Sequence, residues 1–272
     1  VDYSDAKVSI EDRGFQFGDG IYEVIRVYQG KFFYLDRHLE RLAKGAKEIY
    51  LDLDFGIDKL ETVCRQAVRE SGYQNATVYI QVTRGAYPRE HTFPQNTKCT
   101  WVVVVRETKA NPPEFYEQGV YAITVPDERW TRCNIKTVQL LPNSIAKEKA
   151  KRAGAYEAIF HRGDCVTEAS SSNVFIVKNK KLYTHPAVNL ILHGITRRIV
   201  LEIAEKNHIE YSEEVFTLKD LFDADEIFVT GTTTEIMPIV KVDGKIIGDG
   251  VPGEITRFIK EEFYKLTEVI DC

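Results

Sequence analysis

The chain contains the stretch Cys133-Asn134-Ile135-Lys136-Thr137-Val138-Gln139-Leu140-Leu141-Pro142. Its alternating pattern predicts a β-strand that ends at Pro142, because proline cannot donate a hydrogen bond to a neighbouring strand. A period of two places Lys136 on the same face as Val138 and Leu140. Burial of this ammonium would favour the neutral amine, which is the nucleophile that forms a Schiff base with a carbonyl. The alternative is an edge strand from which the Lys136 side chain reaches water.

Length and composition are those of an ordinary globular protein. The 272 residues are 43% hydrophobic and 28% charged, with a formal net charge of -5. This length suggests one or two domains. The acidic balance argues against a nucleic-acid partner, and the longest apolar runs, such as 101–105, are too short to cross a bilayer. We therefore expect neither a nucleic-acid nor a membrane partner.

The cysteines and the first residues indicate the compartment. The cysteines are odd in number and scattered, without the close spacing of a metal site; they are Cys64, Cys99, Cys133, Cys165 and Cys272. No signal-peptide pattern is visible from Val1 onward. We expect a reduced, cytoplasmic setting and no bound metal.

Hydrophobic periodicity predicts helices and strands in an irregular order. Helical spacing is found at 36–50, 58–70, 144–152, 194–207, 218–222 and 253–266. Strands are predicted at 21–28, 78–82, 99–105, 119–125, 156–160, 174–177, 181–183, 226–230, 236–242 and 245–247. The order lacks the regular alternation of a doubly wound sheet, so an α+β fold in two lobes is predicted.

Two segments between these elements predict irregular structure. Residues 11–20 hold three glycines and are expected to form turns before the first strand. The stretch 109–114 contains Pro112 and Pro113, which disfavour a helix and push the preceding residue toward an extended conformation. We predict an N-terminal α+β domain at 1–109, a linker at 110–115 and a C-terminal domain at 116–272.

If Lys136 holds an aldehyde cofactor such as pyridoxal phosphate, the ring nitrogen of that cofactor needs an acidic partner. Glu168 is the candidate, in Cys165-Val166-Thr167-Glu168-Ala169-Ser170-Ser171-Ser172-Asn173. A carboxylate there would keep the nitrogen protonated and make the ring an electron sink. The alternative is a solvated acid in a turn that precedes a polar loop.

The phosphate group of such a cofactor needs amide donors and cations. The helix predicted to begin at Gly194-Ile195-Thr196 carries Arg197 and Arg198 in its first turn, where acidic residues are preferred. An anion bound at Ile195 and Thr196 would account for them. The alternative is that both arginines extend into water.

Further candidates lie in three other segments. Thr230-Gly231-Thr232-Thr233-Thr234 follows an apolar strand and could surround a phosphate, although threonine is common in strands. Arg41 lies next to an inward-facing leucine and could donate to phosphate oxygens, or could be a solvated helix charge. The loop Arg84-Gly85-Ala86-Tyr87-Pro88-Arg89-Glu90-His91 could bind a carboxylate, or could be an ordinary exposed loop.

Together, five motifs resemble the fold-type IV pyridoxal-phosphate enzymes, and within them the bacterial D-amino acid aminotransferase family. They are Arg13-Gly14-Phe15-Gln16-Phe17-Gly18-Asp19-Gly20-Ile21-Tyr22-Glu23, Asn134-Ile135-Lys136, Thr167-Glu168-Ala169-Ser170-Ser171-Ser172-Asn173, Gly194-Ile195-Thr196 and Thr232-Thr233-Thr234-Glu235. Each motif is weak alone. They occur in the family's order and at similar spacing, so the resemblance covers nearly the whole chain, and the combination is specific. The resemblance implies a two-domain α+β enzyme that acts as a homodimer and whose C-terminal domain, 116–272, binds the cofactor.

The resemblance also implies roles for individual residues. Lys136 would bind the cofactor covalently and move a proton between the substrate Cα and the cofactor C4′, and Glu168 would pair with the pyridine nitrogen. The phosphate would be held by Arg41, Ile195, Thr196 and Thr232, and Leu192 would lie under the ring. The substrate carboxylate would be held by Tyr22, Arg89 and His91, with the last two supplied by the neighbouring subunit.

Two positions depart from the family pattern. Gly231 stands where the most similar members usually carry serine, and Arg26 stands where they can carry lysine. The first departure removes a hydroxyl near the expected cofactor, which leaves the fine substrate preference open.

We therefore predict a ping-pong transaminase that acts on D-amino acids and 2-oxo acids, with D-alanine and 2-oxoglutarate as the expected pair. Branched-chain L-amino acid aminotransferase and aminodeoxychorismate lyase are alternatives on the same fold. The pair Arg89 and His91 argues against both, because neither family carries this loop in that role. An inactive binding protein on the same scaffold is a further alternative, which the presence of Lys136 with Glu168 disfavours.

Overall fold

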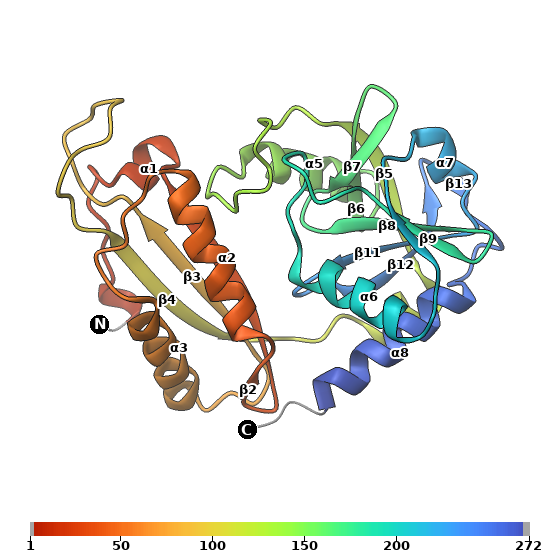
Figure 1. Cartoon of the computed structure of the whole chain (residues 1–272), viewed down its shortest axis with the longest axis horizontal. Helices are drawn as coiled ribbons and strands as arrows, with labels where there is room; N and C mark the ends of the chain where they lie inside the picture. Colours follow the sequence, from red (N-terminus) through yellow and green to blue (C-terminus); the bar gives the residue numbers. More distant parts are fainter. Residues whose placement is uncertain (1–2, 269–272) are drawn as a thin grey trace. The chain divides into compact units, whose positions relative to one another are not determined.

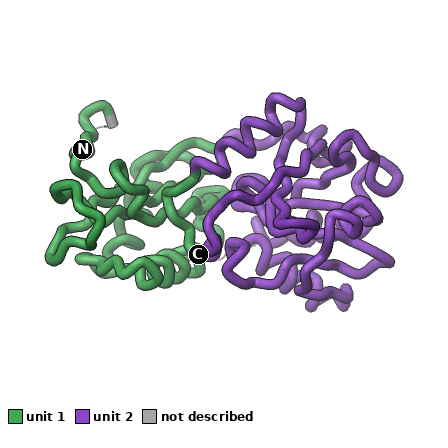
Figure 2. Tube along the Cα trace, turned by 90° about the horizontal axis from the view of Figure 1, so that it is seen from above, with its two compact units in different colours: residues 1–108, 135–140 green, residues 109–134, 141–272 purple. Residues whose placement is uncertain are grey.

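The chain forms two compact units in a computed structural model that describes residues 3–268. Unit 1 comprises residues 1–108 and 135–140, and unit 2 comprises residues 109–134 and 141–272 (Figure 2). The segment 135–140, which the sequence analysis assigned to the C-terminal domain, packs with unit 1. The predictions for Val1 and Cys272 lie outside the described residues.

Unit 1 is an antiparallel sheet with two helices packed against one face (Figure 1). Its strand order is β2-β1-β3-β4, with β1 at Gly20–Tyr28, β2 at Lys31–Phe32, β3 at Ala76–Thr83 and β4 at Thr100–Glu107. The helices are α2, Leu35–Glu48, and α3, Ile57–Ser71. Alternate residues of β3, such as Val78 and Ile80, are fully buried against these helices. The period of two therefore identifies the core face of the sheet.

The glycine-rich segment before β1 forms a short helix, where turns were expected. Helix α1, Arg13–Phe17, begins after Asp12, whose carboxylate accepts from Gly14 N at 2.8 Å. It ends at Gly18, whose φ of +66° is in the left-handed region that favours glycine. A single turn with both ends capped is too short to show helical periodicity in the sequence. A second short element, the 3-10 helix η1, covers Tyr3–Asp5.

The Lys136 segment does not form the predicted strand. Only Thr137 makes a bridge, to Ile21, while Lys136 O accepts from Tyr22 N at 3.0 Å and Val138 N donates to Gly20 O at 3.1 Å. The predicted alternation is present, but the buried residues are those on the other face, including Ile135 and Thr137. The segment has little room to extend, because helix α5, Leu141–Arg152, already begins at Leu141, with Pro142 in its first turn.

Unit 2 is built on one mixed sheet. The strand order is β10-β9-β8-β11-β12-β5-β6-β7, and β13 pairs with β12. The strands are β5 Val120–Pro126, β6 Glu157–Arg162, β7 Cys165–Ala169, β8 Asn173–Lys178, β9 Lys181–Thr184, β10 Tyr211–Glu213, β11 Glu226–Gly231, β12 Glu235–Val242 and β13 Lys245–Ile246. Besides α5, the helices are α4 Pro113–Gln118, α6 Ile195–Lys206, α7 Leu218–Phe222 and α8 Glu254–Glu268. Helices α6 and α8 lie side by side and contact β11 (Figure 1).

The predicted linker contains a helix, which corrects the expectation that the two prolines exclude one. Helix α4 starts at Pro113, and Pro112 is its N-cap residue. Proline suits the first helical position, where the backbone N–H has no partner within the helix and a fixed φ favours the turn. Tyr116 of α4 is buried in the core cluster that includes Ile227 and Val229 of β11.

Within residues 3–268, no helix is long and apolar enough to cross a membrane.

A buried ion network joins the end of α1 to β3 in unit 1. Asp19 accepts from Arg13 Nε at 2.7 Å and from Arg84 Nε at 2.8 Å, and these three side chains are between 2% and 7% exposed. Arg84 also donates to the carbonyl oxygens of Ile49 and Tyr50, both at 2.7 Å. A single carboxylate thus forms ion pairs with two buried guanidinium groups.

We expect Asp19→Asn to lower the free energy of unfolding by about 3 kcal/mol or more, because it leaves two buried cations without a counter-charge. The change is measured by urea-induced unfolding. The matched control is Asp52→Asn, since the Asp52 side chain is exposed and forms no hydrogen bond or ion pair with a described residue. An effect of Asp19→Asn no larger than that of the control would contradict this account of the network.

Candidate active site

Lys136 lies beside Tyr22 in unit 1. The Lys136 Nζ donates to the Tyr22 hydroxyl at 3.2 Å and lies 4.3 Å from the centre of its ring. The backbone hydrogen bond from Tyr22 N to Lys136 O fixes the two residues side by side. Lys136 is half-buried, so its amine is neither enclosed in the core nor fully solvated. The structure thus brings together two of the predicted site residues.

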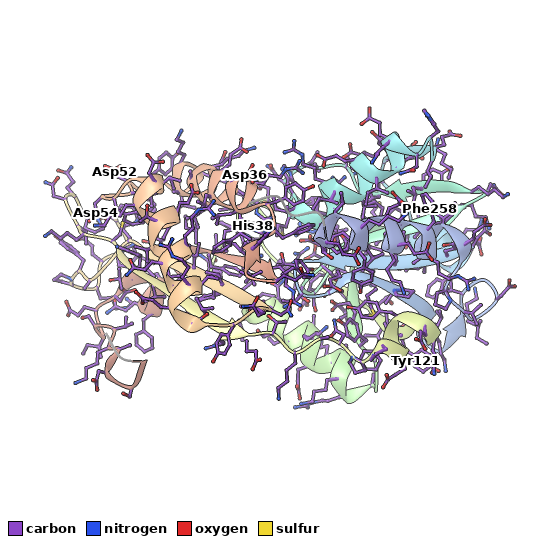
Figure 3. The ribbon with its side chains drawn as sticks, turned by 90° about the horizontal axis from the view of Figure 1, so that it is seen from below. Asp36, His38, Asp52, Asp54, Tyr121 and Phe258 are labelled. Carbon is purple, nitrogen blue, oxygen red and sulfur yellow. The ribbon has the colours of Figure 1, made fainter. Side chains whose placement is uncertain are left out.

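Arg41 forms a two-point ion pair with Glu23, which the sequence analysis missed. Arg41 Nε donates to Glu23 Oε1 at 2.7 Å and Nη2 donates to Oε2 at 2.8 Å. His38 Nδ1, also on α2, lies 2.7 Å from Glu23 Oε2; Figure 3 labels this histidine. A signal was present in the sequence, because Glu23 alternates in register with the buried Ile21 and Ile25 of β1.

The electrostatics of this cluster keep Glu23 ionised. Burial alone would raise the pKa of Glu23, but the charge and hydrogen bonds of Arg41, aided by His38, lower that pKa to about 2. Burial lowers the pKa of His38, and its contact with Glu23 opposes the shift only in part. The cluster therefore presents one carboxylate paired with one permanent cation.

Arg89 and His91 lie together in the loop between β3 and β4. The Arg89 guanidinium carbon is 4.8 Å from the centre of the Phe17 ring, and the His91 ring meets the same ring edge-on at 5.5 Å. Both side chains are exposed. Among the described residues, no hydrogen bond or ring contact joins them to Tyr22, the third member of the predicted carboxylate-binding set.

Glu168 lies in β7 and is buried, not in a solvated turn. Its Oε1 accepts from Arg129 Nη1 at 2.5 Å, and its Oε2 accepts from Asn173 Nδ2 at 2.9 Å and from Leu192 N at 3.0 Å. Burial raises the pKa of Glu168, while the Arg129 charge acts in the opposite direction. The carboxylate is therefore fixed by three donors, one of them the backbone of the predicted ring-contacting Leu192.

Arg129 is a second residue that sequence reasoning missed. Its guanidinium also pairs with Asp127, at 2.9 Å, and donates to the Leu190 carbonyl oxygen at 3.4 Å. Arg129 stands 39 positions before Glu168 and outside any recognisable pattern, so no local signal connects the two.

The serines after Glu168 surround another buried carboxylate. Glu157 is fully buried and accepts from the Ser171 hydroxyl at 3.2 Å, from the Ser172 hydroxyl at 3.0 Å and from the Ser170 hydroxyl. It also accepts from Ala158 N at 2.9 Å. The polar loop predicted from the sequence is thus a tightly hydrogen-bonded turn.

Helix α6 begins at Ile195 with no side-chain cap. Its N-cap residue is Gly194, where a Cβ atom would lie 2.1 Å from Asn173 Oδ1, so only glycine fits. The first backbone N–H groups of a helix lack partners within the helix, which makes Ile195 and Thr196 suitable for an anion. Thr232 follows the end of β11, a strand that α6 contacts.

The two arginines of α6 have protein partners, so they are not evidence for an anion. Arg197 is buried, and it donates to Glu213 Oε2 at 2.6 Å and to the His185 carbonyl oxygen at 2.8 Å. Arg198 is exposed and pairs with Glu202, at 3.0 Å, one turn along the helix. The case for an anion at this helix depends on its uncapped N–H groups instead.

The two positions that depart from the family pattern, Gly231 and Arg26, differ in how closely the protein surrounds them. A Cβ atom at Gly231 would meet the Ser171 carbonyl oxygen at 3.4 Å, an ordinary contact, so the backbone there would accept a larger residue. Arg26 is 7% exposed, and its Nε and Nη1 find no hydrogen-bond partner among residues 3–268. Its guanidinium lies 4.8 Å from the centre of the Tyr28 ring.

Comparison with known proteins identifies the family. The description Amino-transferase class IV applies to the family model that matches residues 20–242. A Staphylococcus epidermidis protein named D-alanine aminotransferase is 49% identical over 265 residues, which are 97% of this chain and 94% of that protein.

Solved structures of similar fold agree with this match. The branched-chain amino acid aminotransferase of Escherichia coli superposes with a TM-score of 0.92 at 28% identity, covering 98% of this chain and 91% of that one. The branched-chain enzyme of Thermoproteus uzoniensis, a thermophilic archaeon, gives 0.88 at 29% identity, covering 98% and 92%. The two-unit α+β fold, the whole-length relatives and the family match lead to one conclusion: this chain belongs to the class IV aminotransferases.

Proposed function

We propose that this protein is a pyridoxal-phosphate-dependent transaminase that moves the amino group between D-amino acids and 2-oxo acids by a ping-pong mechanism. D-Alanine and 2-oxoglutarate are the proposed pair. The observation that carries the proposal is the likeness to proteins named D-alanine aminotransferase, which are 45% to 49% identical over nearly the whole chain. The two branched-chain enzymes compared above are only 28% and 29% identical.

The donors present fit the proposed cofactor. Glu168 is a buried carboxylate fixed by Arg129, Asn173 and Leu192 N, which suits a protonated pyridine nitrogen. The uncapped N–H groups of Ile195 and Thr196 suit a phosphate. The Thr230 hydroxyl, at the end of β11, is buried without a hydrogen-bond partner among the described residues. A further polar group near this strand end would satisfy it.

Each proposed ligand of the cofactor has a defined chemical task. Lys136 would hold it covalently, Arg41, Ile195, Thr196 and Thr232 would hold its phosphate, and Leu192 would lie under its ring. When bound, pyridoxal phosphate supplies an electron sink for the carbanion at the substrate Cα. Arg41 reaches this task already oriented by Glu23, because a two-point pair leaves its other N–H groups in fixed directions.

Lys136 is the proposed acid–base group. Its Nζ would take the proton from the substrate Cα and later return a proton, and the Tyr22 hydroxyl at 3.2 Å would orient the amine between the two events. Arg129 would favour the ionised form of Glu168 and so oppose the effect of burial, which raises the pKa of this carboxyl group.

The handedness of the substrate follows from where its carboxylate is held. With the Cα–H bond directed at Lys136 in either case, inverting the centre exchanges the carboxylate and the side chain. A cationic group on one side therefore selects one hand. Arg89 and His91, with Tyr22, are the proposed group, and we propose that a second subunit of a cytoplasmic homodimer supplies the first two. Their exposure in this chain supports that assignment.

The direct test is an assay of amino transfer to 2-oxoglutarate with D-alanine and L-alanine side by side. We expect activity with the D form to exceed that with the L form by at least tenfold. Lys136→Ala should reduce it by more than the ~10²–10⁴-fold typical of losing one acid–base group, because the covalent anchor is lost as well. Preference for L-alanine, or near-normal turnover by Lys136→Ala without added amine, would refute the proposal.

A second expectation concerns Glu168. The variant Glu168→Gln keeps the size of the side chain but loses the negative charge that favours a protonated ring nitrogen, and its amide nitrogen cannot accept from the donors around Glu168. Removal of the Cα proton should therefore become rate-limiting. We expect the primary isotope effect with Cα-deuterated D-alanine to rise while the cofactor stays bound. An unchanged isotope effect would count against this role for Glu168.

A third expectation concerns the carboxylate. A charge-assisted hydrogen bond of this kind contributes about 1.5–3 kcal/mol, so Arg89→Met should raise KM for D-alanine and for 2-oxoglutarate by roughly ten- to a hundredfold. The ratio of D to L activity should fall, and cofactor absorbance should be retained. If both KM values are unchanged, the carboxylate is held elsewhere and the branched-chain L-amino acid alternative gains support.

A further inference from the structure

The motif Arg13-Gly14-Phe15-Gln16-Phe17-Gly18-Asp19-Gly20 has no task in the proposed reaction, yet it contains the most buried arginine among residues 3–268. Arg13 is 2% exposed and pairs with Asp19. Its Nη1 donates to the Glu90 carbonyl oxygen at 2.5 Å, and Glu90 lies between Arg89 and His91 in the sequence. The motif therefore contacts the backbone of the proposed carboxylate-binding loop.

The near end of that loop is tied to the same motif by its backbone. Arg13 N donates to Gly85 O at 2.9 Å, and Arg84 N donates to Asp19 O at 3.2 Å. Between the end of β3 at Thr83 and the start of β4 at Thr100, where every residue is described, the chain forms no helix or strand. Residues 88–93 thus have no regular structure of their own, and the orientation of Arg89 depends on side-chain contacts.

Those contacts form a stack of rings and guanidinium groups. The Phe17 ring has the Arg13 guanidinium carbon at 4.6 Å, that of Arg89 at 4.8 Å and the His91 ring at 5.5 Å. In the same way the Phe93 ring, beyond His91, has the Arg84 guanidinium carbon at 3.8 Å. Arg13 and Arg84 are buried and paired with Asp19, whereas Arg89 is exposed, so the Arg89 guanidinium is the outermost cation of the stack.

We propose that Phe17 and Arg13, anchored by Asp19, are positioning residues that hold Arg89 and His91 in place before the substrate arrives. The inference rests on the proposed function, because it deepens the role given there to these two residues. An exposed arginine that is ordered only on binding loses side-chain entropy at that moment, and contacts formed beforehand remove part of that cost. Loss of the stack should therefore weaken substrate binding more than it slows turnover.

A matched pair of variants in α1 tests this role. Phe17→Leu removes the ring of the stack, whereas Phe15→Leu makes the same change two residues away, where the ring is 77% exposed and has no ring contact among the described residues. Cation–π contacts at exposed sites are modest, so we expect Phe17→Leu to raise KM for D-alanine and for 2-oxoglutarate by about three- to tenfold, with kcat within about twofold. Phe15→Leu should leave both constants unchanged.

A double variant separates positioning from a general structural effect. In the Arg89→Met background, Phe17→Leu should raise KM by less than about twofold, because the cation that it positions is gone. Independently of catalysis, amide hydrogen exchange in residues 87–94 should be faster in Phe17→Leu than in Phe15→Leu.

The outcomes separate this inference from the proposed function. If Arg89→Met raises KM but Phe17→Leu behaves like Phe15→Leu in both KM and hydrogen exchange, the positioning role is refuted and the proposed function stands. Equal KM increases from Phe17→Leu with and without Arg89 would likewise refute it. If Arg89→Met leaves KM unchanged, the carboxylate assignment fails, and the positioning role fails with it.

Discussion

Buried carboxylates paired with cations hold several candidate functional side chains of this protein in place. Asp19 holds Arg13 and Arg84, Glu23 holds Arg41, and Glu168 is held by Arg129. An unpaired buried charge would be too costly, so each pair constrains two chain segments at once. The paired arginines also restrict neighbouring loops, because Arg84 contacts the Phe93 ring and Arg13 donates to the Glu90 carbonyl oxygen. The ion pairs thus fix the positions of arginines that in turn bind loop segments, as Arg13 binds the Glu90 carbonyl oxygen.

Patterns that span several residues were predictable from the sequence. The helical spacing at 36–50 and the alternation at 78–82 correspond to α2 and β3, because burial of one face imposes a period. Short elements were predictable only in part: the predictions at 218–222 and 245–247 correspond to α7 and β13, whereas α1 and the end of the Lys136 segment were missed. Helix α1 depends on the caps Asp12 and Gly18, and the Lys136 segment ends early because α5 begins at Leu141. In these cases the structure depends on local capping and chain direction, and the segment is too short for a helical or strand period to be visible in the sequence.

The candidate site was also predictable only in part. Residue types with a chemical role, such as Lys136 and Glu168, could be named from the sequence, and the resemblance to a family supplied their roles. Their partners could not, since Arg129 is 39 residues from Glu168 and no periodicity relates them. The arginines of α6 show the opposite error. Their placement against the helix dipole suggested an anion, whereas Arg197 is paired with Glu213. An unusual residue can be explained by a partner that the sequence does not reveal.

The fold itself does not decide which hand of amino acid is used. A branched-chain enzyme superposes on this chain with a TM-score of 0.92, although its sequence is only 28% identical. Function therefore depends on side chains placed on a shared scaffold. As the proposed acid–base group, Lys136 beside Tyr22 would serve proton transfer for either hand, because the Cα–H bond would point at its amine in both. Discrimination must come from whatever fixes the carboxylate. In this chain the loop between β3 and β4 is the element whose orientation is imposed by a buried ion network, and not by regular structure. If the loop between β3 and β4 selects the substrate as proposed, its residues can differ between relatives while the strands that carry it are retained.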